Sequence, residues 1–237
     1  MVSYDIFGQF YDAAMDRRAA QAAYIHSLIA QHRPGAKTLL ELACGTGAIL
    51  EFLSTTYEVS GLDLSTKMLS VARKKLPRAS FFHGNMAIFA LDRRFDVIIC
   101  VFDSINHLLR FTEWRRMFRQ VHAHLEEQGV FVFDMNPERK LQRLIQAPPF
   151  VKTFADHLMI MEVTDAGKGI ANWNIKVFAP RTNAIYELFE ENIKERSFPV
   201  RQVKAALLEQ FSAVKMFDPA RRRSSAQSDR VYFVCQR

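Results

Sequence analysis

Hydrophobic residues along this chain of 237 residues occur in short continuous runs that alternate with longer amphipathic stretches. A short continuous apolar run is typical of a parallel strand covered on both faces, whereas apolar residues three and four positions apart form one face of a helix. Buried strands are therefore expected over residues 38–43, 58–63, 80–83, 95–100 and 129–134. Helices are expected over residues 12–32, after Gly47, over 65–76 with Ser65 as the N-cap, and over 112–127. This alternation predicts the α/β class with a doubly wound, mostly parallel sheet.

The pattern changes after Pro137. A short helix is expected over residues 138–146, followed by three runs that are rich in β-branched and aromatic side chains. These runs cover residues 151–164, 169–179 and 184–195. Turn-forming segments at 165–169 and 180–183 separate them, so the pattern predicts antiparallel strands joined by hairpins.

Near the end of the chain, the alternation of helix and strand patterns resumes and would complete a seven-stranded sheet. A helix is expected over 199–211, with strands over 213–217 and 230–236. We therefore divide the chain into a core of residues 1–147 and 196–237 and an antiparallel β insertion of residues 148–195. The insertion is expected to serve as a lid or substrate platform over the crevice, or to form a dimer contact.

A glycine-rich turn follows the first predicted strand, and an acid ends the second. Gly45 and Gly47 allow backbone to approach a ligand without a Cβ clash, and Asp63 can accept hydrogen bonds from both hydroxyls of a ribose. A dinucleotide fingerprint would need a third glycine where Leu50 stands, and the chain contains no Gly-Lys-Ser/Thr tripeptide. The pattern therefore predicts a ribose-containing cofactor and disfavours NAD and ATP.

Four ordered segments carry a resemblance to a known family. They are Glu41-Leu42-Ala43-Cys44-Gly45-Thr46-Gly47, Gly61-Leu62-Asp63-Leu64-Ser65 with Met68, Gly84-Asn85-Met86, and Phe95-Asp96-Val97-Ile98-Ile99. Together they resemble the motifs of class I S-adenosylmethionine-dependent methyltransferases, and the similarity runs from about residue 4 to 136. The resemblance implies a Rossmann-like fold and S-adenosyl-L-methionine as cofactor.

The resemblance also implies a set of cofactor contacts. Glu41, Gly45 and Gly47 would flank the methionine part, Asp63 would hold the ribose, and Met68, Asn85 and Met86 would meet the adenine. Further contacts are expected from Tyr11, Ala43, Leu64 and Phe102. Ala43 replaces the first glycine of the common pattern, which is tolerable if its φ is not positive. Asn85 replaces the usual aspartate, but its side-chain oxygen can still accept a hydrogen bond from an adenine amine.

His107 is the first candidate for a catalytic residue. Methyl transfer needs a nucleophile held near the methyl carbon and a group that removes its proton. His107 follows the fourth predicted strand, at the edge of the sheet where ligands bind, and an imidazole can take up a proton near neutral pH. This loop resembles the corresponding segment of methyltransferases that act on sugars, amines and glycine-like substrates. The alternative is that His107 only caps or orients the next helix.

Tyr11 and Asp134 complete the candidate catalytic set. The opening segment, with Tyr4 and Tyr11, resembles the part of the same subgroup that folds over cofactor and substrate. Its aromatic spacing is equally typical of a helix face buried against the core. Asp134 ends the fifth predicted strand and could orient the methyl acceptor, or could cap the helix that follows.

Composition and charge limit the partners. The chain is 49% hydrophobic, and it shows no long apolar stretch or signal peptide, so we expect a cytoplasmic enzyme with no membrane partner. Three scattered cysteines indicate reduced thiols, and no metal is expected. The net charge of +7 is concentrated near the end, where Arg221-Arg222-Arg223 suggests an RNA methyltransferase as an alternative. Without an attached nucleic-acid-binding module, nucleic acid is not expected.

The predicted function is transfer of a methyl group from S-adenosylmethionine to a nitrogen or oxygen of a small metabolite. His107 would act as base or proton relay, with Tyr11 and Asp134 orienting the acceptor. The protein is expected to be a monomer or a homodimer formed through the β insertion. A cofactor-binding scaffold without catalytic activity is a further alternative.

Overall fold

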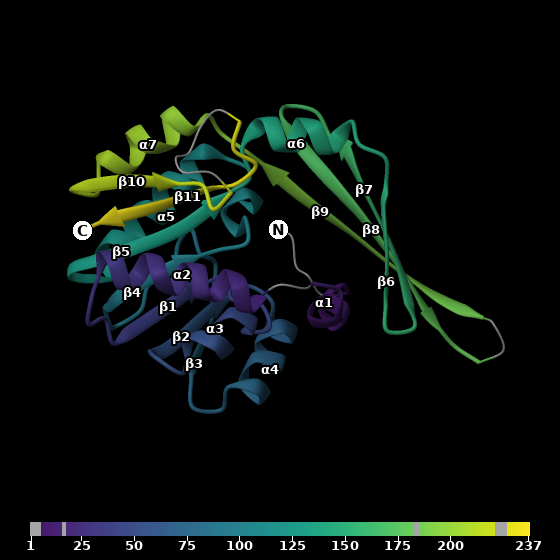
Figure 1. Ribbon diagram of the computed structural model, residues 1–237, viewed down its shortest axis with the longest axis horizontal. Coiled ribbons are helices and arrows are strands. Elements are labelled where there is room, and N and C mark those ends of the chain that lie inside the picture. The colour runs from purple at the N-terminus through teal and green to yellow at the C-terminus, as the bar shows by residue number, and fades with distance from the viewer. Residues whose placement is uncertain (1–5, 16–17, 183–184, 221–226) are drawn as a thin grey trace.

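A seven-stranded sheet forms the centre of the computed structural model, which describes residues 6–15, 18–182, 185–220 and 227–237 (Figure 1). Its strand order is β10-β11-β5-β4-β1-β2-β3. The strands are β1 (Thr38–Leu42), β2 (Glu58–Asp63), β3 (Ser80–His83), β4 (Phe95–Cys100), β5 (Leu125–Met135), β10 (Ala213–Phe217) and β11 (Val231–Gln236). β1 to β5 run parallel, and β11 is antiparallel to both β5 and β10. The predicted fold class is confirmed.

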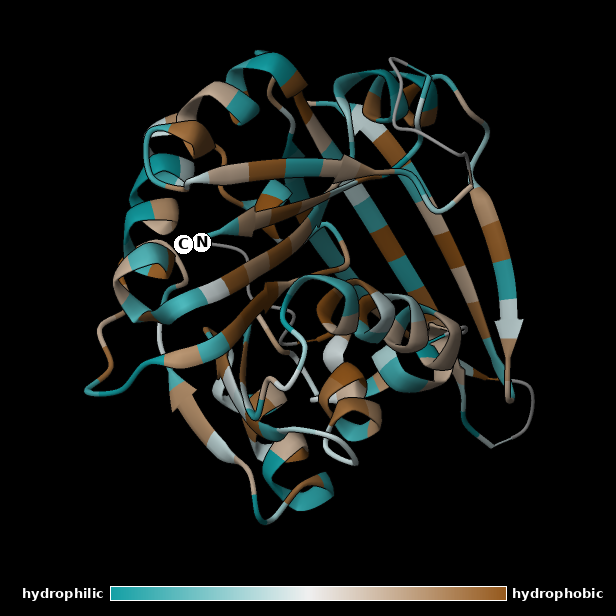
Figure 2. Ribbon diagram, turned by 60° about the vertical axis from the view of Figure 1, so that its left-hand side comes forward, coloured by the Kyte–Doolittle hydropathy of each residue, from teal (hydrophilic) through white to brown (hydrophobic). Residues whose placement is uncertain are grey.

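Helices cover both faces of this sheet, because successive side chains of a strand point to opposite faces. On one face lie α2 (Arg18–His32), α3 (Ala48–Leu53) and α4 (Thr66–Lys75), and on the other α5 (Phe111–His124) and α7 (Val200–Leu208). Leu39 and Val97 pack toward the first group, and Leu40 and Ile98 toward the second. Figure 2 shows the resulting concentration of hydrophobic residues along the strands of this sheet.

A second, antiparallel sheet stands beside the core (Figure 1). It consists of β6 (Phe150–Phe154), β7 (His157–Asp165), β8 (Ile170–Pro180) and β9 (Tyr186–Arg196), in that order, and is preceded by α6 (Glu138–Ile145). The short helix α1 (Gly8–Ala14) lies between this sheet and the core. None of the helices in the described part of the chain has the length and apolar character of a membrane span. The domain division at residues 148 and 195 stays a proposal.

Three predicted elements are wrong in detail. The helix expected over 112–127 ends at His124, because β5 already begins at Leu125. The helix expected over 12–32 is two helices, because Met15 adopts an extended backbone (φ −104°, ψ 110°) that ends α1. The strand expected over 151–164 is a hairpin of β6 and β7, since Ala155 takes the left-handed conformation (φ 44°) between them. The insertion therefore has four strands rather than three.

Candidate active site

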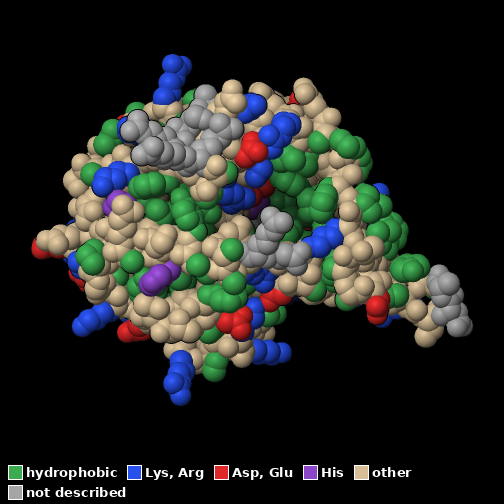
Figure 3. All heavy atoms as spheres, in the orientation of Figure 1, with side chains coloured by type: hydrophobic (Ala, Val, Ile, Leu, Met, Phe, Trp, Pro, Cys, Tyr) green, Lys and Arg blue, Asp and Glu red, His purple; other side chains and the backbone are tan. Residues whose placement is uncertain are grey.

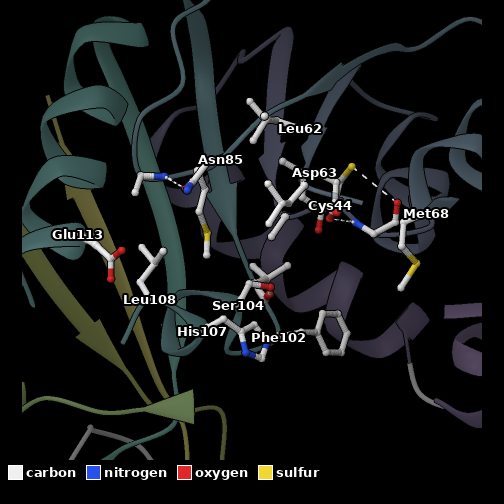
Figure 4. A pocket seen from close by; sticks show the side chains of 18 of the residues that line it. Cys44, Leu62, Asp63, Met68, Asn85, Phe102, Ser104, His107, Leu108 and Glu113 are labelled. Carbon is white, nitrogen blue, oxygen red and sulfur yellow. Dashed lines mark hydrogen bonds between the residues drawn. The ribbon is translucent and has the colours of Figure 1, made fainter. Parts of the chain in front are cut away.

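A cavity of about 810 Å³ opens at the carboxyl ends of β1, β2 and β4. This is the edge of a parallel sheet at which α/β proteins bind ligands. In Figure 3 the surface is hollowed between the core and the second sheet, with hydrophobic side chains around the hollow. Figure 4 shows Asp63, Asn85, Phe102 and His107 around the cavity, so residues from three separate loops meet there.

The loop between β1 and α3 has three left-handed residues, Ala43 (φ 55°), Gly45 (φ 54°) and Gly47 (φ 72°). The sequence allows alanine at position 43, in place of the first glycine, on condition that its φ is not positive. Ala43 does have a positive φ, so this expectation is wrong. A left-handed backbone at a residue other than glycine is strained by roughly 1–3 kcal/mol, and such strain is concentrated at functional sites. Ala43 and Gly45 line the cavity, whereas Gly47 caps α3 and is not among the lining residues.

Asp63 joins this loop to the end of β2. Its Oδ2 accepts a hydrogen bond from the backbone N–H of Gly45 (2.8 Å), and its Oδ1 accepts one from that of Ser65 (2.8 Å). Burial raises the pKa of the Asp63 carboxyl, although these backbone hydrogen bonds act in the opposite direction. A carboxylate offers about four acceptor positions. Asp63 thus has the capacity to bind hydroxyl groups in the cavity as well as the loop.

Glu41, in β1, lines the cavity with an unsatisfied carboxyl group. Only 4% of the residue is exposed, and its Oε2 has no hydrogen-bond partner in the structure. Burial, with the nearby Asp63 carboxylate, raises the pKa of Glu41 well above its usual value. Because buried polar groups are almost always paired, this oxygen is suited to a ligand that carries a cation or a hydrogen-bond donor. The ammonium of a bound amino acid fits that requirement.

The apolar end of the cavity is formed by Met68, Asn85 and Met86, with Leu62 beside them. Ser65 caps α4 by accepting a hydrogen bond from the Met68 N–H (3.2 Å), which confirms the predicted N-cap. The Oδ1 of Asn85 accepts a hydrogen bond from the Ala87 N–H (2.8 Å). Apolar side chains with one amide among them suit a purine ring.

His107 ends the short 3-10 helix η1 (Ser104–His107) that follows β4. Its Nδ1 lies 3.2 Å from the backbone carbonyl oxygen of Lys194 in β9, and a carbonyl only accepts, so Nδ1 carries the hydrogen. Burial lowers the pKa of His107, and the Asp103 carboxylate offsets this only in part. The neutral ring therefore holds its lone pair on Nε2, as a general base requires.

Tyr11 reaches the cavity from α1, which is not part of the sheet whose strand ends carry most of the other residues. Burial, followed by the charge of Asp103, raises the pKa of Tyr11 to about 12. Its hydroxyl therefore stays protonated at neutral pH and can donate a hydrogen bond. Tyr4, named with it, lies outside the described residues, as does the Arg221–Arg223 run.

Asp134 does not occupy the place expected for an acceptor-binding residue. It has no exposed surface and is not among the residues that line the cavity. Its carboxylate accepts from the backbone N–H groups of Phe102 (2.7 Å) and Asp103 (3.0 Å) and pairs with Arg230. Asp134 thus does not face the cavity. It fixes the backbone of the loop that leads to His107.

Four basic residues of the cavity wall were missed by the sequence analysis. Arg18, Arg110, Arg116 and Lys194 come from α2, the start of α5 and β9. These elements are separated by long stretches of chain, so no local motif marks the four residues as a group. In the sequence, the positive charge is instead most concentrated near the end of the chain, around Arg221–Arg223.

Residues 39–129 match the family model for a methyltransferase domain. This match, together with the fold and the cavity, shows a methyltransferase domain in the chain, which resembles class I S-adenosylmethionine-dependent methyltransferases. The sequence is 39% identical over 132 residues to a dTDP-3-amino-3,6-dideoxy-alpha-D-glucopyranose N,N-dimethyltransferase of Streptomyces fradiae, covering 55% of this chain and 51% of that protein. The chain thus spans about half the length of this relative and of a comparable one from Streptomyces venezuelae.

Solved structures share the fold over the whole chain. An S-adenosylmethionine-dependent methyltransferase from Clostridium acetobutylicum superposes with a TM-score of 0.84 at 23% identity, covering 98% of this chain and 96% of that one. CalS10, an amino pentose methyltransferase from Micromonospora echinaspora, gives a TM-score of 0.81 at 24% identity, with 100% and 98% covered. The match includes the second sheet, which is therefore shared by other proteins of this fold.

Proposed function

We propose that this enzyme transfers the methyl group of S-adenosylmethionine to an amine of a small metabolite, with an amino sugar as the favoured acceptor. The observation that supports it most is the position of His107, a neutral imidazole in the same cavity as Asp63 and Glu41. The Streptomyces relatives are named as N,N-dimethyltransferases of amino sugars linked to dTDP.

The donor would be held by residues whose chemistry fits each of its parts. Asp63 would accept hydrogen bonds from the ribose hydroxyls, and the unsatisfied carboxyl of Glu41 would face the ammonium of the methionine part. Met68, Asn85 and Met86 would enclose the adenine. Bound in this way, the donor supplies an electrophilic methyl group attached to a positively charged sulfur.

The acceptor side would be served by His107 and Tyr11. Nε2 of His107 would take the proton that the acceptor nitrogen loses, and would later release it to solvent. The Tyr11 hydroxyl would donate a hydrogen bond that orients the acceptor. A neutral imidazole is a sufficient base for an ammonium but a weak one for an alcohol, which favours nitrogen over oxygen.

The basic cavity wall supports an acceptor that carries negative charge. Arg110, Arg116 and Lys194 contribute cationic side chains around the cavity, and Glu113 balances part of that charge through its pair with Arg110 (3.1 Å). Arg18 also lines the cavity, but its guanidinium is paired with Asp12. Guanidinium groups bind phosphate oxygens with good geometry. A sugar carried on a nucleoside diphosphate would fit this surface.

The test combines calorimetry with product analysis. We expect S-adenosylmethionine and its demethylated product to bind, and NAD and ATP not to bind. Mass spectrometry should then find methylated product with a dTDP-linked amino sugar and none with the matching sugar that has a hydroxyl in place of the amine. Methylation of RNA instead would favour the RNA alternative, and donor binding without transfer to any acceptor would favour a scaffold.

Quaternary structure and cellular location stay predictions. The outward face of the second sheet exposes Val151 on β6 and Tyr186 and Leu188 on β9. Exposed apolar residues of this kind support the proposal of a homodimer formed through the insertion. Light scattering of the wild-type protein and of Leu188→Glu would distinguish a dimer from a monomer. A cytoplasmic location is expected.

A further inference from the structure

One carboxylate, Asp12, connects α1 to three elements of the methyltransferase core. Its Oδ1 accepts hydrogen bonds from the Thr46 hydroxyl (2.6 Å) and from Nη1 of Arg18 (2.6 Å). Its Oδ2 accepts one from Nζ of Lys75 (2.7 Å). Thr46 belongs to the glycine-rich loop, Arg18 begins α2 and Lys75 ends α4. Asp12 therefore gathers donors from three separate parts of the core.

The charge balance around Asp12 favours the ionised, bound carboxylate. Partial burial acts to raise its pKa, but the hydrogen bonds from Lys75, Thr46 and Arg18 outweigh that effect and hold the pKa below its usual value. Thr46 is 2% exposed, so its hydroxyl would otherwise face little water. Charge-assisted hydrogen bonds of this kind are the stronger ones in proteins.

The opposite side of α1 belongs to the second sheet. Phe10 packs edge-on against Phe154 and Phe189, with ring centroids 6.5 and 5.0 Å apart. Nζ of Lys152 donates a hydrogen bond to the carbonyl oxygen of Ala14 (2.8 Å). Because α1 is anchored to the second sheet by this apolar packing, its attachment to the core depends largely on polar contacts.

Tyr11, the neighbour of Asp12, is directed into the cavity by the same attachment. Nη2 of Arg18 donates to the Tyr11 carbonyl oxygen (2.9 Å), and the Arg18 guanidinium lies over the Tyr11 ring, 5.1 Å from its centroid. Gly8 also lies against the core, since a Cβ at that position would be 3.1 Å from the side chain of Met68. The contacts that hold α1 against the core therefore also fix the position of Tyr11.

We propose that Asp12 is a positioning residue that holds α1 closed over the methyl-donor site and sets Tyr11 in the cavity. Breaking its contacts with Thr46 and Lys75 releases α1 from the glycine-rich loop and from α4, and opens a path for the donor. The inference rests on the proposed function for the identity of the donor, but the attachment of α1 is a property of the ligand-free protein.

The experiment compares Asp12→Asn with Glu58→Gln. Glu58 forms an exposed ion pair with Arg93 (3.0 Å) at the other end of β2, so its variant loses an equal charge away from the site. Hydrogen exchange of the α1 amides is measured in the ligand-free protein, and release of radiolabelled S-adenosylmethionine is measured by dilution into unlabelled donor.

In Asp12→Asn we expect both rates to rise by about tenfold or more, which corresponds to the loss of one charge-assisted hydrogen bond. Glu58→Gln should match the wild type in both. Unchanged exchange and release in Asp12→Asn would overturn the proposal, as would equal changes in the two variants. If the wild type binds no donor, the proposed function fails, and the exchange measurement still decides whether Asp12 holds α1.

Two milder variants guard against a folding defect in Asp12→Asn. Thr46→Val keeps the shape of the side chain and removes one hydrogen bond, and Lys75→Met removes another with little change in length. Each should give a smaller acceleration in the same direction. The absence of any acceleration in both would refute the role of Asp12 as the attachment point.

Discussion

Replacement of Asp134 by asparagine tests whether this residue supports the catalytic loop instead of binding the acceptor. The carboxylate is fully buried and holds the N–H groups of Phe102 and Asp103, both of which have a positive φ (58° and 53°). Asparagine keeps the shape but offers one acceptor oxygen, and its amide would point a donor at the loop N–H groups or at Arg230.

The magnitude follows from burial and from the remaining partners. Removing one member of a buried ion pair typically destabilises a protein by about 3–5 kcal/mol. Asp103 still pairs with Arg230 through Nη2 (2.6 Å) in the variant, so the lower end, about 3 kcal/mol, is expected. For a chain of this size, that corresponds to a fall in Tm of about 6–12 °C.

Calorimetric or circular-dichroism melting measures the stability, and methyl transfer is assayed well below the melting range of the variant. Turnover should fall by about tenfold or more, because His107 moves with the loop, while donor affinity stays within about threefold. Asp96→Asn is the matched control. Asp96 also accepts from backbone N–H groups, those of Lys37 (2.9 Å) and Thr38 (3.1 Å), but at the opposite edge of the sheet.

Asp96→Asn should reduce stability with little effect on turnover in the folded enzyme. An Asp134→Asn variant that melts within about 1 °C of the wild type would show that the buried network contributes little and refute the reasoning. A variant with normal stability and a raised KM for the acceptor alone would restore the original interpretation of Asp134 as an acceptor-binding residue.

Three further variants test the donor site, the base and the sheet. Asp63→Ala should weaken donor binding about ten- to hundredfold in calorimetry, the loss of charged hydrogen bonds to a ribose, and unchanged affinity would exclude that role. For His107, burial lowers the pKa, so turnover should decline as the pH falls through a midpoint below about 6.5, and His107→Gln should lack this acid limb as well as most activity. Gly61→Ala should lower the free energy of unfolding by about 1–3 kcal/mol in denaturant titration, because its Cβ would lie 2.6 Å from the Cys44 Sγ and 2.8 Å from the Phe81 ring.

Most of the central sheet could be predicted from sequence because its inner strands are largely buried on both faces. The strands at 58–63, 80–83, 95–100 and 213–217 have the predicted bounds. Inner strands of a parallel sheet are largely apolar, and the polar or glycine-rich residues at their ends mark where they stop. The edge strands β3 and β10 are only partly buried. The second sheet was predicted less well, since the turn at Ala155 contains neither glycine nor proline.

For the candidate site as well, residues in local motifs were predicted better than residues whose partners are distant in the sequence. Residues attached to single motifs, such as Asp63, Glu41 and Asn85, line the cavity, and their contacts with the cofactor stay a prediction. Asp134 satisfied the same rule, as an acid at the end of a parallel strand, but Arg230 lies 96 residues further along the chain and pairs with it. No local sequence pattern could reveal that Arg230 would pair with the Asp134 carboxylate.

The sequence by itself determined most of the sheet and the part of the cavity proposed to hold the donor, because a parallel sheet brings the ends of its strands to one edge and each motif there is local. Only the tertiary structure decided the part proposed to hold the acceptor. There α1, η1, α5 and β9 meet through long-range packing, which joins Tyr11, His107 and the basic wall residues. Side chains from such distant segments become neighbours only when the second sheet and α1 pack against the core, and that packing is not encoded in any one stretch of the chain.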